Sequence, residues 1–227
     1  MNISKEAKIR HGLSQWFHRC MAHQLMRKKT SPIPFGTYYE FGVGWGGTLR
    51  TYFDALEKFC EKFEKKPSDF RIHTFDSFEG LPESTHTADQ HPSWGKGKLA
   101  YSIDYIKEML NQYPFSQSFE NISFTKGFFE NSLTEELQKK LAAYPPGIVT
   151  IDVDFYTSTK EVLQWLRPIM MSGTNIFFED FWSFHGHPDY GQVRAIKEFN
   201  AENDGHLVPT YAMNGCAYVY TRKDYEY

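Results

Sequence analysis

The chain has 227 residues, and its 25 Lys and Arg residues against 28 Asp and Glu leave a formal net charge of −3. A balance this even offers no strong field for nucleic acid or an anionic membrane, so neither is an expected partner. No apolar run reaches the roughly 20 residues of a membrane-spanning helix, and the N-terminus has no apolar signal core. The three cysteines fit neither a disulfide framework nor a zinc site, which indicates a reducing compartment. We expect a single cytoplasmic domain over residues 1–227, because a chain of this length can bury a core by itself.

The N-terminal segment has the spacing of an amphipathic helix. Apolar residues recur at intervals of three and four over residues 4–28, and the opposite face is basic. The pattern predicts an N-terminal helical arm within residues 1–30. This arm could dock on the rest of the domain, cover a binding pocket, or join two copies of the chain in a homo-oligomer.

The stretch over residues 38–50, YYEFGVGWGGTLR, is typical of a buried strand, a glycine turn and the start of a helix. The turn contains four glycines: Gly42, Gly44, Gly46 and Gly47. Glycine tolerates both positive φ angles and close approach of the backbone to a ligand at a helix N-terminus. The carboxylate of Glu40, just before the turn, suits a nucleoside amino acid with an ammonium group better than a pyrophosphate, which it would repel. A tight turn without a ligand is the alternative.

A second strand, over residues 71–76, ends in Asp76. In nucleotide-binding α/β units an acid at this place accepts hydrogen bonds from the ribose hydroxyls. The alternative for Asp76 is a carboxylate that caps a turn or a helix. The polar segment that follows has no periodicity and indicates a lid or insertion over residues 84–120. Because loop histidines are usually solvated, neither His86 nor His91 is predicted to bind substrate.

The remaining elements alternate between helices and strands. Helices are expected over residues 102–113, from 135 onward, and over 158–171 and 192–200. Strands are expected over residues 122–127, 148–151 and 175–178. The chain closes with an antiparallel hairpin of residues 207–213 and 216–221, joined by a two-residue turn at Asn214 and Gly215. The pattern predicts an α/β fold with a mostly parallel sheet.

Acidic residues follow two of the predicted strands. Asp152 and Asp154 come after residues 148–151, and Glu179 and Asp180 come after residues 175–178. The carboxyl ends of parallel strands meet at one edge of the sheet, so these acids should converge beside the glycine turn. Grouped carboxylates repel one another unless a cation lies between them, and oxygen ligands suit Mg²⁺ or Ca²⁺. Acids that only cap helices and loops are the alternative.

Five pieces in this order carry a resemblance: EFGVGWGG, FDSFEGLPE, KGFFENSL, IDVDFYTST and FFEDFW. The chain resembles the class I S-adenosylmethionine-dependent methyltransferases, and among them the macrocin (macrolide-sugar) O-methyltransferase family. The resemblance implies a three-layer sandwich around a seven-stranded Rossmann-like sheet with the antiparallel hairpin at its C-terminal edge. It also implies in-line transfer of a methyl group to a hydroxyl of a sugar or another small natural product, with S-adenosylmethionine and Mg²⁺ as cofactors.

The resemblance also implies roles for individual residues. The methionine part of the cofactor would be held by Glu40, Gly42, Gly44, Gly47 and Thr48. The ribose would be held by Asp76 and Ser77, and the adenine by Gly127 and Phe128. The Mg²⁺ ligands would be Asp152, Glu179 and Asp180, although members of the family usually carry Asp-Asp or Asp-Asn where this chain has Glu-Asp.

The proton of the acceptor hydroxyl would go to Asp152 or Asp154, with His185 or His187 as the other candidate base. Two other functions stay open at this point. The spacing Gly42-x-Gly44-x-x-Gly47 also matches the fingerprint of an NAD-dependent oxidoreductase. The fold could also serve a cofactor-binding module that carries out no reaction.

Overall fold

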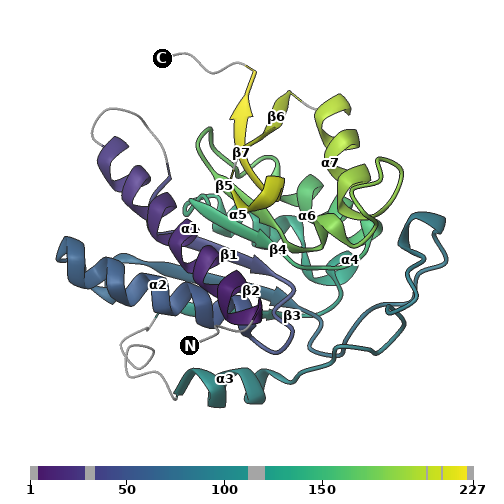
Figure 1. Ribbon diagram of the computed structural model, residues 1–227, viewed down its shortest axis with the longest axis horizontal. Coiled ribbons are helices and arrows are strands. Elements are labelled where there is room, and N and C mark those ends of the chain that lie inside the picture. The colour runs from purple at the N-terminus through teal and green to yellow at the C-terminus, as the bar shows by residue number, and fades with distance from the viewer. Residues whose placement is uncertain (1–4, 29–33, 112–120, 203, 211, 224–227) are drawn as a thin grey trace.

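The computed structural model describes residues 5–28, 34–111, 121–202, 204–210 and 212–223, and they form a seven-stranded sheet in the order β3-β2-β1-β4-β5-β7-β6 (Figure 1). The strands are β1 Thr37–Phe41, β2 Arg71–Asp76, β3 Ile122–Lys126, β4 Ile148–Ile151, β5 Asn175–Phe178, β6 Gly205–Pro209 and β7 Ala217–Arg222. β1 to β5 pair in parallel, whereas β7 runs antiparallel to both β5 and β6. The predicted fold class is confirmed.

Helices cover both faces of the sheet (Figure 1). They are α1 Lys5–Arg27, α2 Gly47–Phe63, α3 Ile103–Asn111, α4 Phe129–Ser132, α5 Glu135–Leu141, α6 Tyr156–Leu166 and α7 Gly191–Glu202. Successive residues of a strand point to opposite faces, so β1 supplies Tyr38 to the core under α1 and α2 and Tyr39 to the core under α6 and α7. Both tyrosines are 0% exposed, which fixes the middle strand between the two layers.

The predicted N-terminal helix packs against α2 (Figure 1). Its inner face is buried through Leu13, Trp16, Phe17, Cys20 and Met21. The inner face is narrower than the sequence pattern indicates, because Ile9 and Met26 are 56% and 67% exposed. Gln24 on the same helix donates a 2.6 Å hydrogen bond to the carbonyl of Gly147. The helix therefore docks on its own domain, and a homo-oligomer formed through it stays a prediction.

Two element boundaries differ from those predicted. The helix expected over residues 158–171 is α6, Tyr156–Leu166, because Pro168 has no N–H to continue the helical ladder. The hairpin expected to turn at Asn214 and Gly215 instead has β6 and β7 paired as far as Pro209 and Tyr218, with residues 210–216 between them. Asn214 and Gly215 lie in a short 3₁₀ segment of that connection, so the two-residue turn was wrong.

No helix in the described part of the chain is long and apolar enough to span a membrane. The predicted lid or insertion begins as a loop with one 3₁₀ turn, η2 Thr87–Asp89, and continues into α3. Its last residues, 112–120, lie outside the described residues.

Candidate active site

A cavity of about 520 Å³ lies at the carboxyl ends of the parallel strands. The glycine turn after β1, the ends of β2, β3 and β4, and the first part of the insertion contribute to its wall. Eight of the residues predicted from the sequence line it: Gly42, Gly44, Asp76, Ser77, Gly127, Phe128, Asp152 and Asp154. The sheet thus brings together residues that lie up to 112 positions apart in the chain.

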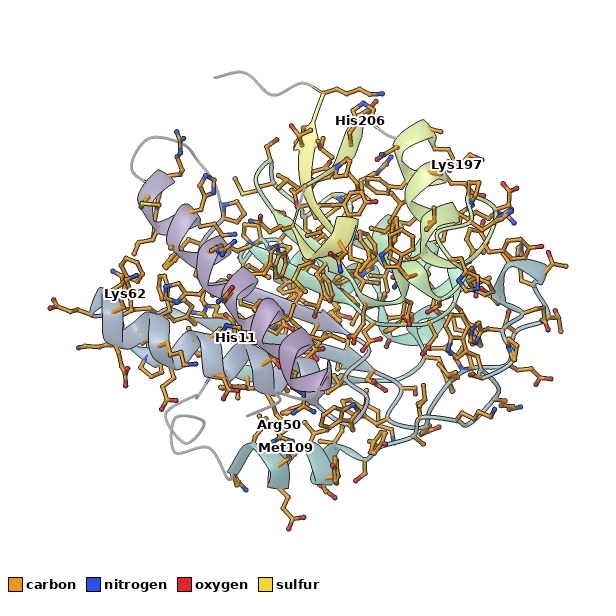
Figure 2. All side chains as sticks on the ribbon, viewed as in Figure 1. His11, Arg50, Lys62, Met109, Lys197 and His206 are labelled. Carbon is orange, nitrogen blue, oxygen red and sulfur yellow. The ribbon has the colours of Figure 1, made fainter. Side chains whose placement is uncertain are left out.

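The glycine turn has the conformation that its composition predicts. Gly42 has a φ of +78°, and a Cβ there would lie 1.7 Å from the backbone carbonyl oxygen of Asp152, the residue that follows β4. Gly46, with a φ of +83°, would place a Cβ 2.3 Å from Cε of Met109 on α3, whose side chain Figure 2 labels beside the start of α2. At Gly44 a Cβ would meet no atom within 4 Å, and this glycine lines the cavity. Two of the glycines are needed for packing, and Gly44 leaves room for a ligand.

Glu40, at the end of β1 just before the turn, is 0% exposed and is not among the residues that line the cavity. The Tyr38 hydroxyl donates to its Oε2 at 2.8 Å and lies 2.7 Å from Oγ1 of Thr150 on β4. Since the single Tyr38 proton goes to Glu40, the Thr150 hydroxyl donates to Tyr38. No described group bonds the other oxygen, Oε1. Burial raises the pKa of Glu40 to about 8, although the Tyr38 hydrogen bond lowers it.

Asp76 holds two loops together. Its Oδ2 accepts hydrogen bonds from the backbone N–H groups of Val43 at 2.7 Å and Gly44 at 3.2 Å, and its Oδ1 accepts from Phe78 at 2.6 Å. The glycine turn and the loop after β2 are therefore fixed to the same carboxylate. Asp76 also lines the cavity, so a ligand hydroxyl would meet oxygens that already accept three backbone protons.

The acids that follow β4 and β5 come close to one another. The backbone N–H of Asp154 donates to Oδ2 of Asp180 at 2.8 Å, and Asp154 itself has a φ of +59°. Burial and the neighbouring carboxylates raise the pKa of Asp154 to about 6, that of Asp180 to about 8, and that of Asp152 well above its usual range. The Thr48 hydroxyl donates to Glu179 at 3.2 Å.

The donor chemistry of this group suits a hard cation, since every ligand atom is an oxygen. The positions of the side chains do not yet form a metal site. Among the described residues, no group of three or more His, Cys, Asp or Glu side chains is arranged so that it could bind a metal ion. One oxygen of Asp180 is taken by the Asp154 N–H, and one of Glu179 by the Thr48 hydroxyl.

The cavity is acidic. Six carboxylates line it: Asp76, Glu83, Glu130, Asp152, Asp154 and Glu161. Burial raises the pKa of Glu161, and the nearby Glu130 adds to the shift. No Lys or Arg of the described residues lines the wall. Such a field repels a pyrophosphate and attracts a cation such as a sulfonium or an ammonium group, which argues against NAD as the ligand.

A model of the macrocin-O-methyltransferase family (TylF) matches residues 19–209. The chain belongs to this family. A curated relative from Streptomyces olivaceus, 8-demethyl-8-(2,3-dimethoxy-alpha-L-rhamnosyl)-tetracenomycin-C 4'-O-methyltransferase, is 26% identical over 116 residues. That match covers 49% of this chain and only 42% of the relative's length.

Two solved structures are similar in fold. The calicheamicin methyltransferase CalS11 has a TM-score of 0.65 at 20% identity, over 99% of this chain and 95% of its own. The O-methyltransferase NovP has a TM-score of 0.66 at 20% identity, over 92% of this chain and 78% of its own. At these identities the likeness shows the methyltransferase fold alone.

Six predicted site residues of this macrocin-O-methyltransferase family member do not line the cavity: Glu40, Gly47, Thr48, Glu179, Asp180 and His185. The roles of the first five stay predictions. His185 is exposed, with a φ of +55°, in the loop after the 3₁₀ turn η4 Glu179–Trp182. Sequence reasoning missed Trp45, His86, Thr157 and Glu161 on the wall. Trp45, inside the glycine turn, and Thr157, inside IDVDFYTST, lay within recognisable patterns, whereas His86 and Glu161 did not.

The insertion is docked onto the sheet edge. Asp89, which is 2% exposed, accepts hydrogen bonds from the hydroxyls of Ser84 at 2.6 Å and Thr157 at 2.7 Å. Further along, the ring of Trp94 lies 5.7 Å from that of Phe155 and 5.4 Å from that of Phe184. These contacts join the insertion to the start of α6 and to the loop before α7, so it forms one wall of the cavity.

Proposed function

We propose that this chain is a cytoplasmic S-adenosylmethionine-dependent O-methyltransferase that acts on a hydroxyl of a sugar or another small natural product. The observation that carries the proposal is the common cavity: the glycine turn and the acids Asp152 and Asp154 line the same space. Membership of the macrocin-O-methyltransferase family supports the same reaction class. The acidic wall suits a positively charged methyl donor.

The cofactor would lie along the strand ends. Gly44 and Gly42 would face its methionine part, with Glu40, Gly47 and Thr48 supporting the turn from behind. Asp76 and Ser77 would meet the ribose, and the backbone at Gly127 and the ring of Phe128 would meet the adenine. All of these except Glu40, Gly47 and Thr48 line the cavity.

In the reaction, the acceptor oxygen attacks the methyl carbon in line with the sulfur. The new O–CH₃ bond forms as the S–CH₃ bond breaks, its electron pair stays on sulfur, and S-adenosylhomocysteine leaves. The hydroxyl proton passes to a carboxylate oxygen of Asp152 or Asp154, both of which line the cavity. Holding the two reactants in this alignment supplies much of the rate enhancement. His185 is a weaker candidate for the base, because it lies outside the wall.

A divalent ion is a separate part of the proposal. Asp152, Glu179 and Asp180 would hold Mg²⁺, which when bound supplies a Lewis acid that lowers the pKa of the acceptor hydroxyl. The chemistry of the oxygen donors and the raised pKa values of Asp152 and Asp180 support a cation between them. To bind the ion, the side chains of Asp180 and Glu179 would have to turn toward it. Asp180 now accepts a hydrogen bond from the Asp154 N–H, and Glu179 accepts one from the Thr48 hydroxyl.

The test supplies purified protein with methyl-labelled S-adenosylmethionine and a panel of glycosides, beginning with p-nitrophenyl α-L-rhamnoside. This probe is chosen because the curated relative is named for action on a rhamnosyl group. Label should move to the sugar, with one S-adenosylhomocysteine formed per methyl. EDTA followed by added Mg²⁺ measures the contribution of a metal separately.

Two variants sharpen the test. Asp152→Asn should lower turnover at least about 100-fold while the cofactor still binds. The control, Asp189→Asn, alters an exposed acid outside the cavity that pairs with Lys197, and should keep full activity. If calorimetry showed that the protein binds NAD and does not bind S-adenosylmethionine, the proposal would be contradicted. Cofactor binding with no transfer to any acceptor would indicate a module that carries out no reaction.

A further inference from the structure

The candidate is a histidine of the insertion that the proposed reaction does not use. His86 lines the cavity, and its ring packs on that of Tyr156 at 4.9 Å between centroids and 39° between planes. Tyr156 begins α6, two residues after Asp154. The neighbouring Thr157 is bound by Asp89 of the insertion. His86 and the two acids that would take the proton of the acceptor hydroxyl, Asp152 and Asp154, therefore line the same cavity.

The hydrogen bonds of His86 define which nitrogen carries the proton. The backbone N–H of Ala88 donates to its Nδ1 at 3.0 Å, so Nδ1 carries a lone pair and the neutral ring is protonated at Nε2. No described group accepts a hydrogen bond from Nε2. His86 lines the cavity, and the Nε2–H of its neutral ring is a donor that no described protein group takes. It cannot act as a base there, because the nitrogen that could take a proton is the one bonded to Ala88.

A donor at this place has a distinct chemical use. The six carboxylates of the wall accept hydrogen bonds, so they suit the hydroxyl and ammonium groups of a ligand. They offer nothing to an oxygen without a proton, such as a ring, glycosidic or carbonyl oxygen. The hydroxyls of Ser77, Ser84 and Thr157, also on the wall, already donate to protein oxygens. The side-chain donors left on the wall are those of His86, Trp45, Thr85, Tyr101 and Ser158.

We infer that His86 binds the methyl acceptor, by donating from Nε2–H to an oxygen of the acceptor that has no proton of its own, and so orients the reacting hydroxyl toward Asp152 and Asp154. This inference rests on the proposed function. It assigns the acceptor rather than the cofactor, because the ring belongs to the insertion and packs at the start of α6. The glycine turn, Asp76 and Gly127 lie on other segments of the wall.

Two substitutions separate the two nitrogens of the ring. His86→Asn keeps an oxygen that can accept from the Ala88 N–H but removes the donor in the cavity. His86→Gln places an amide N–H near the position of Nε2. The chain offers a matched control in His91, whose Nδ1 accepts from the Ser93 N–H at 3.3 Å in the same local arrangement, outside the cavity. His91→Asn repeats the chemical change outside the cavity, at a ring that packs on Trp94 at 4.4 Å and on Phe184 at 5.4 Å, so equal urea stability of the His86→Asn and His91→Asn variants is required for the comparison.

Initial rates with p-nitrophenyl α-L-rhamnoside should show a rise in the acceptor KM of roughly 3- to 10-fold for His86→Asn, the range expected for one neutral hydrogen bond. His86→Gln should recover most of that loss, and His91→Asn should match the wild type. The KM for S-adenosylmethionine should stay within about twofold throughout. The pH profile of kcat should keep its shape in both His86 variants, because this ring transfers no proton.

Nitrogen NMR of ¹⁵N-histidine-labelled protein tests the tautomer without any acceptor. Protonation at Nε2 is expected, and protonation at Nδ1 would overturn the inference. So would an unchanged acceptor KM in His86→Asn, or a change confined to the cofactor KM. If the wild-type protein methylates none of the glycosides, the proposed acceptor class fails, and the tautomer then decides whether His86 presents the donor.

Discussion

Replacing Tyr38 by phenylalanine should destabilise this protein more than the same change one residue later. The Tyr38 hydroxyl, fully buried, donates to Glu40 at 2.8 Å and lies 2.7 Å from Thr150. Without it, Glu40 loses its side-chain partner at Oε2, while Oε1 already has none among the described residues. Tyr39 provides the control, because its ring is equally buried but its hydroxyl donates to the Tyr144 carbonyl at 2.9 Å, near the surface.

The magnitude follows from these bonds. Tyr38→Phe removes two buried hydrogen bonds and leaves the buried Glu40 carboxyl without a side-chain partner, which together cost about 2 to 4 kcal/mol. Tyr39→Phe removes the bond to the Tyr144 carbonyl and a longer one of 3.5 Å to the Leu141 carbonyl but leaves no carboxyl group without a partner, at a cost of about 1 kcal/mol. Urea unfolding at pH 7 measures both, and equal m-values would show that the unfolded states are comparable. Equal losses for the two variants would refute the idea that Tyr38 stabilises a buried acid beneath the glycine turn.

Two further changes test the turn and a buried histidine. Gly42→Ala should cost on the order of 4 kcal/mol, because its Cβ would lie 1.7 Å from the Asp152 carbonyl oxygen, whereas Gly44→Ala should cost about 1 kcal/mol yet weaken S-adenosylmethionine binding in calorimetry. Equal stabilities for the two alanine variants would contradict this. Burial and nearby cations lower the pKa of His73 to about 4, so at this site the unfolded chain binds more protons between pH 4 and 6.5, and the contribution of His73 to stability should fall by about 2 kcal/mol from pH 7 to 5, against the opposite contribution of the acids with raised pKa values. His73→Asn should remove that fall in urea titrations, and an unchanged pH dependence would show that His73 does not cause it.

The sequence predicts the central strands closely, and β2, β4 and β5 have the bounds expected. These strands are short runs of β-branched and aromatic residues that end in acids. Because both faces of such a strand are buried, the pattern leaves few alternatives for where the strand begins and ends. The errors lie at the edges. Asn214 and Gly215 have the composition of a hairpin turn, but their positive φ values belong to a 3₁₀ segment. The connection between the two strands is longer than the predicted two residues, since β6 ends at Pro209 and β7 begins at Ala217. Local turn chemistry does not define how far two strands pair.

The candidate site is predictable where topology alone brings residues together. Asp152 and Asp154 follow a strand in the middle of a parallel sheet, so their place beside the glycine turn follows from the order of the elements. His86 could not be found this way. Its position depends on how the insertion docks through Asp89 and Trp94, and no periodicity marks those contacts. Side-chain direction also escapes the sequence, as Glu40 shows, since it is fully buried and does not line the cavity.

The acids at the strand ends have a structural task as well as a chemical one. Asp76 holds the N–H groups of Val43 and Gly44, and Asp180 holds that of Asp154. Each carboxyl group therefore fixes a loop that lines the cavity, and the pKa values of Asp152, Asp154 and Asp180 are raised because burial and the neighbouring carboxylates disfavour their charged forms. A cationic donor relieves the resulting repulsion, so the free energy stored in crowding these carboxylates favours binding of a sulfonium over that of its neutral thioether product. The wall that aligns the reactants would thereby also promote release of S-adenosylhomocysteine after transfer.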